Sequence, residues 1–395
     1  MSKSFLSRLT ITFFCMALPV AMAQTQLKVA TFNVSMEAQN YLPRGEPGNS
    51  QVLIDILATG EQQQVKNIAA IIQRVRPDIL LLNEFDYIDD PKLGIEAFIK
   101  NYLNKAQAGS EAIDYPYYFY HTVNTGQPSP FDLDNDGNAT GVGADAWGYG
   151  FYPGQYGMVL LSKYPIDKQG VRTFQHFKWH AMPDHLKTNK ADGTAWYSKE
   201  AWQQFPLSSK AHWDIPVQVN GRVIHILASH PTPPVFDGPE NRNGNRNHDE
   251  IRFWSDYLTS DAAGYIYDDK GQVGGLAADK TFIILGDLNA SAEGEGDAIP
   301  AAIQGLVAHP RVNATVIPQS VGGAEHSPDR AYGATHTAVW RMRADYVLPA
   351  KNQLQVKDSG VFWPQQTEAD YRLIAARGAS SDHRLVWMSL LVTAE

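Results

Sequence analysis

The stretch "FIILGDLNAS", residues 282–291, decides the fold, because an apolar run ends abruptly in polar residues. Four apolar residues lead into Gly286, Asp287 and Asn289. A short apolar run of this kind is typical of a buried β-strand, which does not need a carboxylate or an amide at its end. The alternative is a turn in which Gly286 takes a positive φ and Asp287 caps the backbone. We favour a core strand that delivers Asp287 and Asn289 to a functional site.

Similar apolar runs occur along the whole chain and alternate with a helical pattern. Val65, Ile68, Ala69 and Ile72 have the spacing of one helix face, and this helix is expected to stop at 76–78. Strands are predicted at 27–34, 79–82, 156–162, 222–229, 281–286, 344–349 and 383–392. No repeat or low-complexity linker divides the 395 residues. The chain after the first 23 residues is therefore expected to form one α/β domain, residues 24–395.

Residues 90–215 are the least regular part of the sequence and are rich in Tyr, Trp, Gly and Pro. They are predicted to form long loops between core strands, and loops of this length usually serve binding. Their aromatic residues could stack on bases or sugars. The alternative, that they pack these loops down onto the domain, is the better interpretation.

Polar residues lie at the ends of the predicted strands, far apart in sequence. Strand ends of α/β sheets converge in space, and ligands gather outside them. Carboxylate and amide oxygens suit a hard ion such as Mg²⁺, and histidines can transfer protons near neutral pH. Each residue alone could be a turn, cap or hydrogen-bonded strand exit, but the combination predicts one active site formed by Asn33, Glu84, His230, Asp287, Asn289, Asp345, Asp382 and His383.

Seven motifs carry a resemblance that extends over residues 27–392. In chain order they are "TFNV", "LLLNEFD", "LLSKYPI", "ASHPTPP", "ILGDLNA", "RADYVLP" and "SSDHRLV". Together they resemble the endonuclease/exonuclease/phosphatase superfamily, the deoxyribonuclease I-like proteins, in a secreted bacterial form. The resemblance implies a four-layer α/β sandwich, with two mixed β-sheets packed face to face and helices outside.

The resemblance also implies a metal centre. Glu84 would be the principal Mg²⁺ or Mn²⁺ ligand, Asn33 would lie beside it and contact the metal or the phosphate, and Asp382 would support the metal region. Whether the site uses one metal ion or two stays open.

The remaining site residues would carry the reaction itself. Asp287 and Asn289 would orient the attacking water and the phosphate, and His230 would donate to a phosphoryl oxygen. His383, paired with Asp345, would be the general base or another proton-transferring group. Hydrolysis of a phosphodiester needs an aligned water, a cation on the non-bridging oxygens and donors that strengthen as charge develops.

These residues predict a metal-dependent phosphoric ester hydrolase that acts on a phosphodiester or phosphomonoester. One alternative is a secreted nuclease acting on DNA or RNA. A second is a catalytically inactive relative that binds a ligand on the same fold. A third, an unrelated calcium-stabilised binding protein, leaves "GDLN" and "SDH" unexplained.

Residues 1–23 have the pattern of a secretory signal peptide. Lys3 and Arg8 precede the apolar run "ITFFCMALPV", and "AMA" at 21–23 provides small residues for cleavage. The alternative is an uncleaved anchor, but the run is shorter than the roughly 20 residues that span a bilayer. A secreted or periplasmic monomer without stable membrane insertion is expected. The only cysteine, Cys15, would be removed with the signal.

The net charge of the chain is −9, and loss of Lys3 and Arg8 makes it −11. No stretch of Lys and Arg is present that would follow a duplex backbone. Nucleic acid is therefore a possible substrate, but tight nonspecific binding to it is not expected.

A second metal site is predicted in "DLDNDG", residues 132–137. Asp132, Asp134 and Asp136 have the spacing of the first ligands of a calcium loop, and Gly137 occupies its sharp turn. Pro128 and Pro130 exclude a normal entering helix. The hypothesis is a non-helical Ca²⁺ loop completed by Asn138 or Asp145, and the alternative is an ion-free turn.

The segment 241–254 follows His230 and is predicted to open a helix. Asn247 and Glu250 have the spacing of a capping box, and Ile251, Trp254 and Leu258 would share one face of the helix. Two arginines of this segment could hold an anionic substrate, namely Arg242 and Arg246.

Overall fold

The computed structural model describes residues 25–393 and contains two mixed β-sheets. The predicted signal peptide, residues 1–23, lies outside the described residues. The six-stranded sheet has the order β10 (Leu354–Val361), β11 (Val386–Val392), β1 (Thr25–Met36), β2 (Ile79–Phe85), β4 (Met158–Ser162) and β3 (Tyr117–Phe119). The five-stranded sheet has the order β5 (Arg172–Thr173), β6 (His212–Val219), β7 (Arg222–Ser229), β8 (Thr281–Asp287) and β9 (Asp345–Pro349).

The two sheets pack face to face. β1 contacts β8 and β9 across the interface, and β2 contacts β8. Every residue of β8 and six of the seven residues of β2 are buried, because one face of each strand meets the other sheet and the other face is covered from outside. The parallel pairs are β1 with β2 and β7 with β8, and the other pairs are antiparallel.

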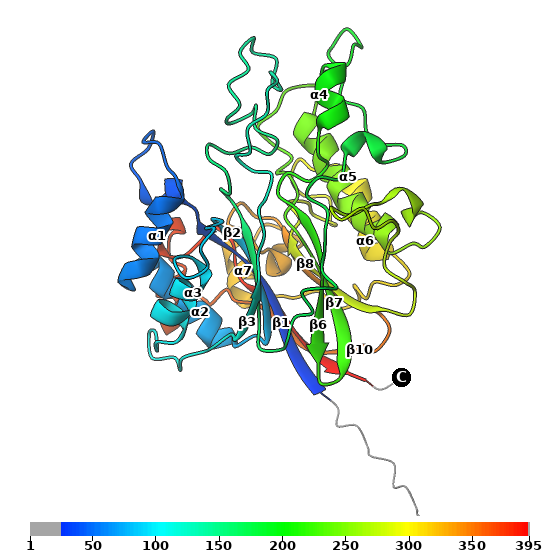
Figure 1. The fold of residues 1–395 in the computed structure, drawn as a ribbon. Coiled ribbons are helices and arrows are strands. Elements are labelled where there is room, and N and C mark those ends of the chain that lie inside the picture. Colours follow the sequence, from blue (N-terminus) through cyan, green and yellow to red (C-terminus); the bar gives the residue numbers. More distant parts are fainter. Residues whose placement is uncertain (1–24, 394–395) are drawn as a thin grey trace, which may run out of the picture.

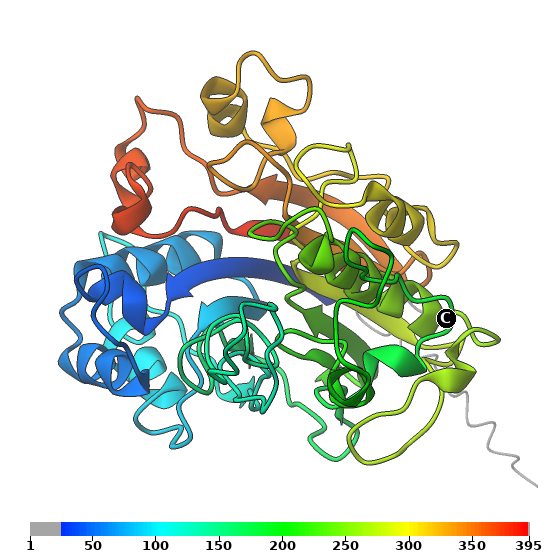
Figure 2. The same cartoon turned by 90° about the horizontal axis from the view of Figure 1, so that it is seen from above.

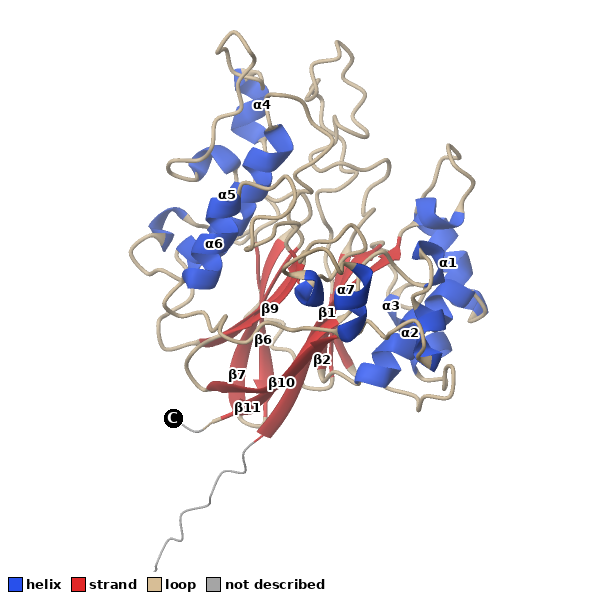
Figure 3. Ribbon diagram, turned by 180° about the vertical axis from the view of Figure 1, so that it is seen from behind, coloured by secondary structure: helices blue, strands red, loops and turns tan. Residues whose placement is uncertain are grey.

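Helices form the two outer layers, as Figures 1 and 3 show. Beside the first sheet lie α1 (Ser50–Thr59), α2 (Gln63–Val75) and α3 (Ile95–Phe98). Beside the second lie α5 (Arg242–Tyr257) and α6 (Pro300–Ala308). The predicted four-layer sandwich is confirmed. Two shorter helices, α4 (Lys199–Gln204) and α7 (Val321–His326), lie in connections.

All seven predicted strands and the predicted helix are present. The helix is α2, whose apolar face is fully buried, and it ends at Arg76, which has a left-handed φ of 54° before Pro77. Among the described residues, no helix is both long enough and apolar enough to cross a membrane.

Strand β6 was not predicted, and it begins at His212, inside the region 90–215 that was expected to be irregular. Pro216 lies in the middle of β6, and proline lacks the N–H of a strand ladder. Pro216 instead pairs with His225 of β7, and its carbonyl accepts from Asp167 N. Strands β3, β5 and β10 were also not predicted.

The long connections lie at one end of the sandwich, together with α4 (Figures 1 and 2). Their aromatic residues pack on one another: Trp179 is fully buried, contacts Trp202 and Phe205, and donates its indole N–H to Asp249 at 2.7 Å. Tyr197 stacks on Trp202. These contacts support the interpretation that the aromatics hold the loops in place.

Candidate active site

Strand ends from both sheets meet at the candidate site. Asp287 is the last residue of β8 and is paired in register with Asp345, the first residue of β9. Asn83 of β2 connects the sheets, because its Oδ1 accepts the backbone N–H of Asp287 at 3.3 Å. The antiparallel pairing of β8 and β9 is thus the reason that two carboxylates from distant parts of the chain lie together.

Asp287 is the centre of the site and is only 1% exposed. Its Oδ2 accepts from Asn33 Nδ2 at 3.1 Å and lies 3.4 Å from Nε2 of both His230 and His383. Its Oδ1 accepts the backbone N–H of Asn289 at 3.0 Å. One carboxylate therefore links five of the residues that were predicted to act together.

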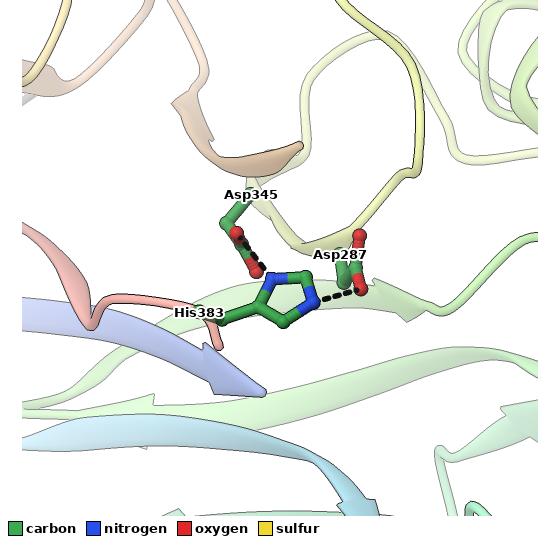
Figure 4. A group of neighbouring side chains, drawn as sticks. All are labelled: Asp287, Asp345 and His383. Atoms are coloured by element: carbon green, nitrogen blue, oxygen red, sulfur yellow. Dashed lines mark hydrogen bonds and ion pairs between the residues drawn. The ribbon is translucent and has the colours of Figure 1, made fainter. Parts of the chain in front are cut away.

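His383 lies between two carboxylates (Figure 4). Its Nδ1 is 2.9 Å from Asp345 Oδ2, which also accepts from the Thr337 hydroxyl at 2.7 Å. Burial lowers the pKa of His383, but the charges of Asp345 and Asp287 outweigh burial and raise the pKa to about 10. His383 is therefore an imidazolium at neutral pH.

His230 is shifted in the opposite direction. Burial holds its pKa well below the ordinary value, and the positive charges of Lys210 and His383 lower it further. Its Nδ1 is buried and has no hydrogen-bond partner among the described residues. The site therefore contains one charged and one neutral histidine. Burial raises the pKa of Asp287 to about 7, with contributions from Asp345 and Glu84 that the His383 charge opposes.

Glu84, Asn33 and Asp382 form the predicted metal-binding part of the site. Burial raises the pKa of Glu84, the charge of His383 and a hydrogen bond with Asn33 lower it, and the charge of Asp382 raises it. Asp382 accepts from Ser35 Oγ at 3.2 Å. Within residues 25–393, Glu84 has no ion pair with lysine or arginine. Two carboxylates of which one is costly to ionise fit a hard divalent cation, whereas the Asn33 amide faces the carboxylates with its NH₂ group and its Oδ1 accepts from Ser35 N at 3.2 Å.

A different trio has ligand atoms within 4.8 Å of one another, namely Asp287, Asp345 and His383. Both ring nitrogens of His383 face carboxylates, and a metal ligand must be an imidazole with a free lone pair. We therefore assign this trio to proton handling rather than to metal binding. The metal ligands Glu84, Asn33 and Asp382 stay a prediction.

The backbone around the site is strained. Several non-glycine residues of the described chain have a positive φ, a region that side chains disfavour, and four of them are in or beside the site segments, namely Ser35, Glu84, Tyr156 and Asn289. Such conformations cost on the order of 1–3 kcal/mol each and cluster at functional sites. Gly286 is not among the residues of positive φ, so that part of the alternative turn is wrong, whereas Asp287 does cap the backbone, because its Oδ1 accepts the N–H of Asn289. Glycine is required there because a Cβ would lie 2.1 Å from the carbonyl oxygen of Ser229.

The predicted capping box at Asn247 and Glu250 is wrong. α5 begins at Arg242, five residues earlier, with Asn241 as its N-cap. Three-residue spacing places both side chains on one face of the helix, and this face contacts the strand-end loops. Asn247 Nδ2 donates to the carbonyls of Thr232 and Leu288, at 2.8 and 3.0 Å. The two residues thus position the loops that follow His230 and Asp287.

Arg246 is a structural residue, and its predicted role in substrate binding is wrong. The side chain is buried, and its guanidinium donates to the backbone carbonyls of Trp147, Pro206, Leu207 and Ser208. Arg242 pairs with Glu240 and lies over the ring of Trp196, 5.4 Å from its centroid. The structure gives Arg242 no contact with the described site residues.

Lys210 belongs to the site and was not predicted. It is 5% exposed, and the charges of Glu250, Glu84 and Asp287 act on its ammonium group. Lys210 precedes β6 by two residues. The sequence "KAHWDIPV" could have indicated this residue, because Lys210 comes just before a strand pattern. The strand was not recognised because it contains Pro216.

The acidic loop of residues 132–137 brings its three carboxylates within 4.8 Å of one another. They accept backbone N–H groups: Asp132 from Gly137 at 2.9 Å, Asp134 from Asp136 at 3.2 Å and Asp136 from Asn138 at 2.7 Å. Asp145 is already bonded to the N–H groups of Leu133 and Thr140. Of the two residues proposed to complete the loop, Asn138 is therefore the better candidate, and calcium binding stays a prediction.

Calcium is expected to raise the melting temperature by on the order of a few °C through this loop, because a ligand that binds only the folded state stabilises it. Asp134→Ala should remove this response. Asp192→Ala is the control, because Asp192 closes a similar exposed turn at Thr194 outside the acidic loop. Thermal unfolding with Ca²⁺ and with chelator measures both, and an unchanged response in Asp134→Ala would make the loop an ordinary turn.

The two-sheet α/β sandwich thus gathers carboxylates, amides and two histidines at its strand ends. The chain belongs to the Endonuclease/Exonuclease/phosphatase family, whose sequence model matches residues 30–383. Members of this family are generally hydrolases that act on phosphoesters. No curated protein matches the sequence.

Solved structures with a similar fold share little sequence with the chain. An endonuclease/exonuclease/phosphatase from Beutenbergia cavernae is 16% identical with a TM-score of 0.52, and the match covers 93% of this chain and 72% of that one. Sphingomyelinase C from Streptomyces griseocarneus is 15% identical with a TM-score of 0.45, covering 92% and 99%. The human Nocturnin catalytic domain is 14% identical with a TM-score of 0.43, covering 94% and 98%.

Proposed function

We propose that this protein is an exported phosphoesterase that hydrolyses a phosphodiester with water, using a divalent cation, a buried carboxylate and two histidines. The observation that carries the proposal is Asp287, whose Oδ2 faces Asn33, His230 and His383 at 3.1–3.4 Å. An inactive binding protein has no need of a buried carboxylate that costs stability and faces one charged and one neutral histidine.

The opposite charge states of the histidines suggest their roles. The pairing of His383 with Asp345 left two roles open, general base or another proton-transferring group. Because His383 already carries its proton, the second role is favoured. A base works best when its pKa is close to the operating pH, and the pKa of Asp287 is about 7. We assign to Asp287 the role of accepting the proton of the attacking water, because it lies against both histidines at the centre of the site and burial raises its pKa toward neutral pH.

The neutral His230 is suited to contact the phosphoryl group. Its Nε2 lies 3.4 Å from Asp287 Oδ2 without forming a hydrogen bond to it, so a better acceptor can take its place. A phosphoryl oxygen that gains negative charge is such an acceptor, and donors that face developing charge lower the barrier. Asn289 Nδ2, which donates to Pro231 O at 3.2 Å, holds the neighbouring backbone in place.

Glu84, Asn33 and Asp382 would hold the divalent cation, Mg²⁺ or Mn²⁺. When bound, the cation supplies positive charge to the non-bridging oxygens and orients the phosphate. These residues lie beside the Asp287 cluster, because Asn33 contacts both Glu84 and Asp287.

Export is proposed from the charged start, the apolar run and the small residues at 21–23. The intact mass of protein recovered outside the cytoplasm tests it. A mature chain beginning at Gln24 is expected, and a full-length chain retained in the membrane would contradict export.

The preferred substrate is proposed to be a small phosphoester, a head group or a frayed strand, with a secreted nuclease as the second candidate. The chain has a net charge of −9 and gains little from the long-range attraction that brings proteins to duplex DNA. Duplex DNA is therefore expected to be a mediocre substrate.

A comparison of initial rates at fixed salt and Mg²⁺ tests the substrate proposal. The substrates are duplex DNA, single-stranded DNA, RNA, sphingomyelin, phosphoinositides and small phosphoesters. The variant Asp287→Asn, treated in parallel, shows how much activity comes from contaminants. If duplex DNA were cleaved fastest by a wide margin, the deoxyribonuclease alternative would be right.

A further inference from the structure

Lys210 is a buried lysine whose role the proposed chemistry leaves open. It is 5% exposed and lies where the charges of Glu84, Asp287 and Glu250 act on it. The same ammonium lowers the pKa of His230. The antiparallel pairing of His212 with Ser229 places the segment before β6 beside the segment that follows β7, so Lys210 lies at the same end of the sheet as His230 and within reach of the Glu84 and Asp287 charges.

The backbone on both sides of Lys210 is fixed. The N–H of Ser209 donates to Glu250 Oε1 at 2.6 Å, and the carbonyl of Lys210 accepts from Asn124 N at 3.0 Å. Glu250 also binds the N–H of Thr232 through its other oxygen, at 2.6 Å. The carboxylate of Glu250 in α5 thus fixes the position of the Lys210 segment relative to the loop that follows His230.

The ammonium itself has no dedicated partner. Glu250, the largest opposing charge, directs both oxygens to backbone N–H groups. In the described part of the chain, Lys210 Nζ forms no hydrogen bond and no ion pair within 4.0 Å. The side chain is mostly buried, yet Nζ is not among the fully enclosed unpaired atoms, so this poorly solvated charge stays accessible to a ligand. Burial lowers the pKa of Lys210, which the three carboxylates only partly oppose. A cationic side chain in this arrangement is suited to bind an anionic ligand.

We propose that the ammonium group of Lys210 binds an unesterified oxygen of the substrate's phosphoryl group. This inference rests on the proposed function and adds a specific anion-binding residue to it. A divalent cation at Glu84 and the ammonium of Lys210 are like charges that act on the same carboxylate. They repel each other unless an anion lies between them. A phosphoryl group is such an anion, so phosphate and the divalent cation are expected to strengthen each other's binding.

The test measures binding rather than turnover, by titration calorimetry with inorganic phosphate and with MgCl₂. Lys210→Met should weaken phosphate binding in the presence of Mg²⁺ at least about tenfold, the scale of one charge-assisted hydrogen bond. Lys210→Arg should restore part of this loss. In the absence of phosphate, Lys210→Met should bind Mg²⁺ as tightly as the wild type or more tightly, because a repelling charge is gone.

The matched control is Lys178→Met, because Lys178 is a half-buried lysine that donates to the carbonyl of Gln204, outside the site. It should change neither affinity. A parallel loss of Mg²⁺ and phosphate affinity in Lys210→Met would show a merely structural role and overturn the inference, as would unchanged phosphate affinity or no phosphate binding by the wild type. If the wild type binds phosphate through Lys210 but hydrolyses no phosphoester, the proposed function fails and the inference stands.

Discussion

Chelation of divalent cations is expected to abolish hydrolysis of a generic phosphodiester such as bis-p-nitrophenyl phosphate. Glu84 has no basic ion-pair partner in the described chain, and burial raises its pKa. Without a cation, Lys210 and the Arg377 that pairs with Asp382 oppose only part of the repulsion that Glu84 and Asp382 exert on an anionic substrate. Activity should fall to the background rate, and added Mg²⁺ or Mn²⁺ should restore it.

Glu84→Gln separates loss of the metal from other effects of the chelator. This variant keeps the size of the side chain but removes a charged ligand, so it should need far more Mg²⁺ for half-maximal rate. Glu96→Gln is the control, because Glu96 is a partly buried carboxylate that accepts from Tyr118 away from the site. Undiminished hydrolysis by thoroughly metal-free protein would contradict the metal requirement.

The strands and most of the site could be predicted from the sequence because both depend on local pattern. β2 and β8 are continuous apolar runs, and each ends in an acidic residue at its last or penultimate position. A polar residue at the end of a buried strand has few structural reasons to be there. Glu84 and Asp287 could therefore be selected without knowledge of the fold.

The supporting residues could not be predicted, because their roles depend on which loops the fold brings to α5. Glu250 receives N–H groups from Ser209 and Thr232, which are 41 and 18 residues away in sequence. Arg246 binds carbonyls of a loop that has no sequence signature for this contact. Periodicity places these side chains on one helix face, but it cannot show whether that face meets solvent, substrate or backbone.

Asp287→Asn is expected to lower kcat at least about 10³-fold, the combined scale of a lost base and lost charge stabilisation. The substitution keeps the volume of the side chain. It removes a negative charge that, with Asp345, holds His383 protonated. It also places an uncharged amide against the Asn33 donor and the Nε2 atoms of both histidines. Proton acceptance from water and the orientation of both histidines should fail together.

The fold should not suffer in this variant. The ordinary pKa of an aspartate is 3.8, and burial raises that of Asp287 to about 7. Between these two values the folded protein holds a proton that the unfolded chain has released, so ionisation of Asp287 at higher pH costs the folded state free energy. A neutral asparagine avoids this cost, and the melting temperature at pH 8 should be unchanged or higher.

Asp214→Asn is the matched control. Asp214 is also buried and accepts from His225 and from the Tyr257 hydroxyl, each at 2.6 Å, but it lies along β6 rather than at a strand end. This variant should lose stability and keep kcat within about twofold, because its hydrogen bonds stabilise the fold alone. Steady-state kinetics and thermal unfolding of the two variants should therefore give opposite results. Wild-type turnover in Asp287→Asn would remove this carboxylate from the mechanism.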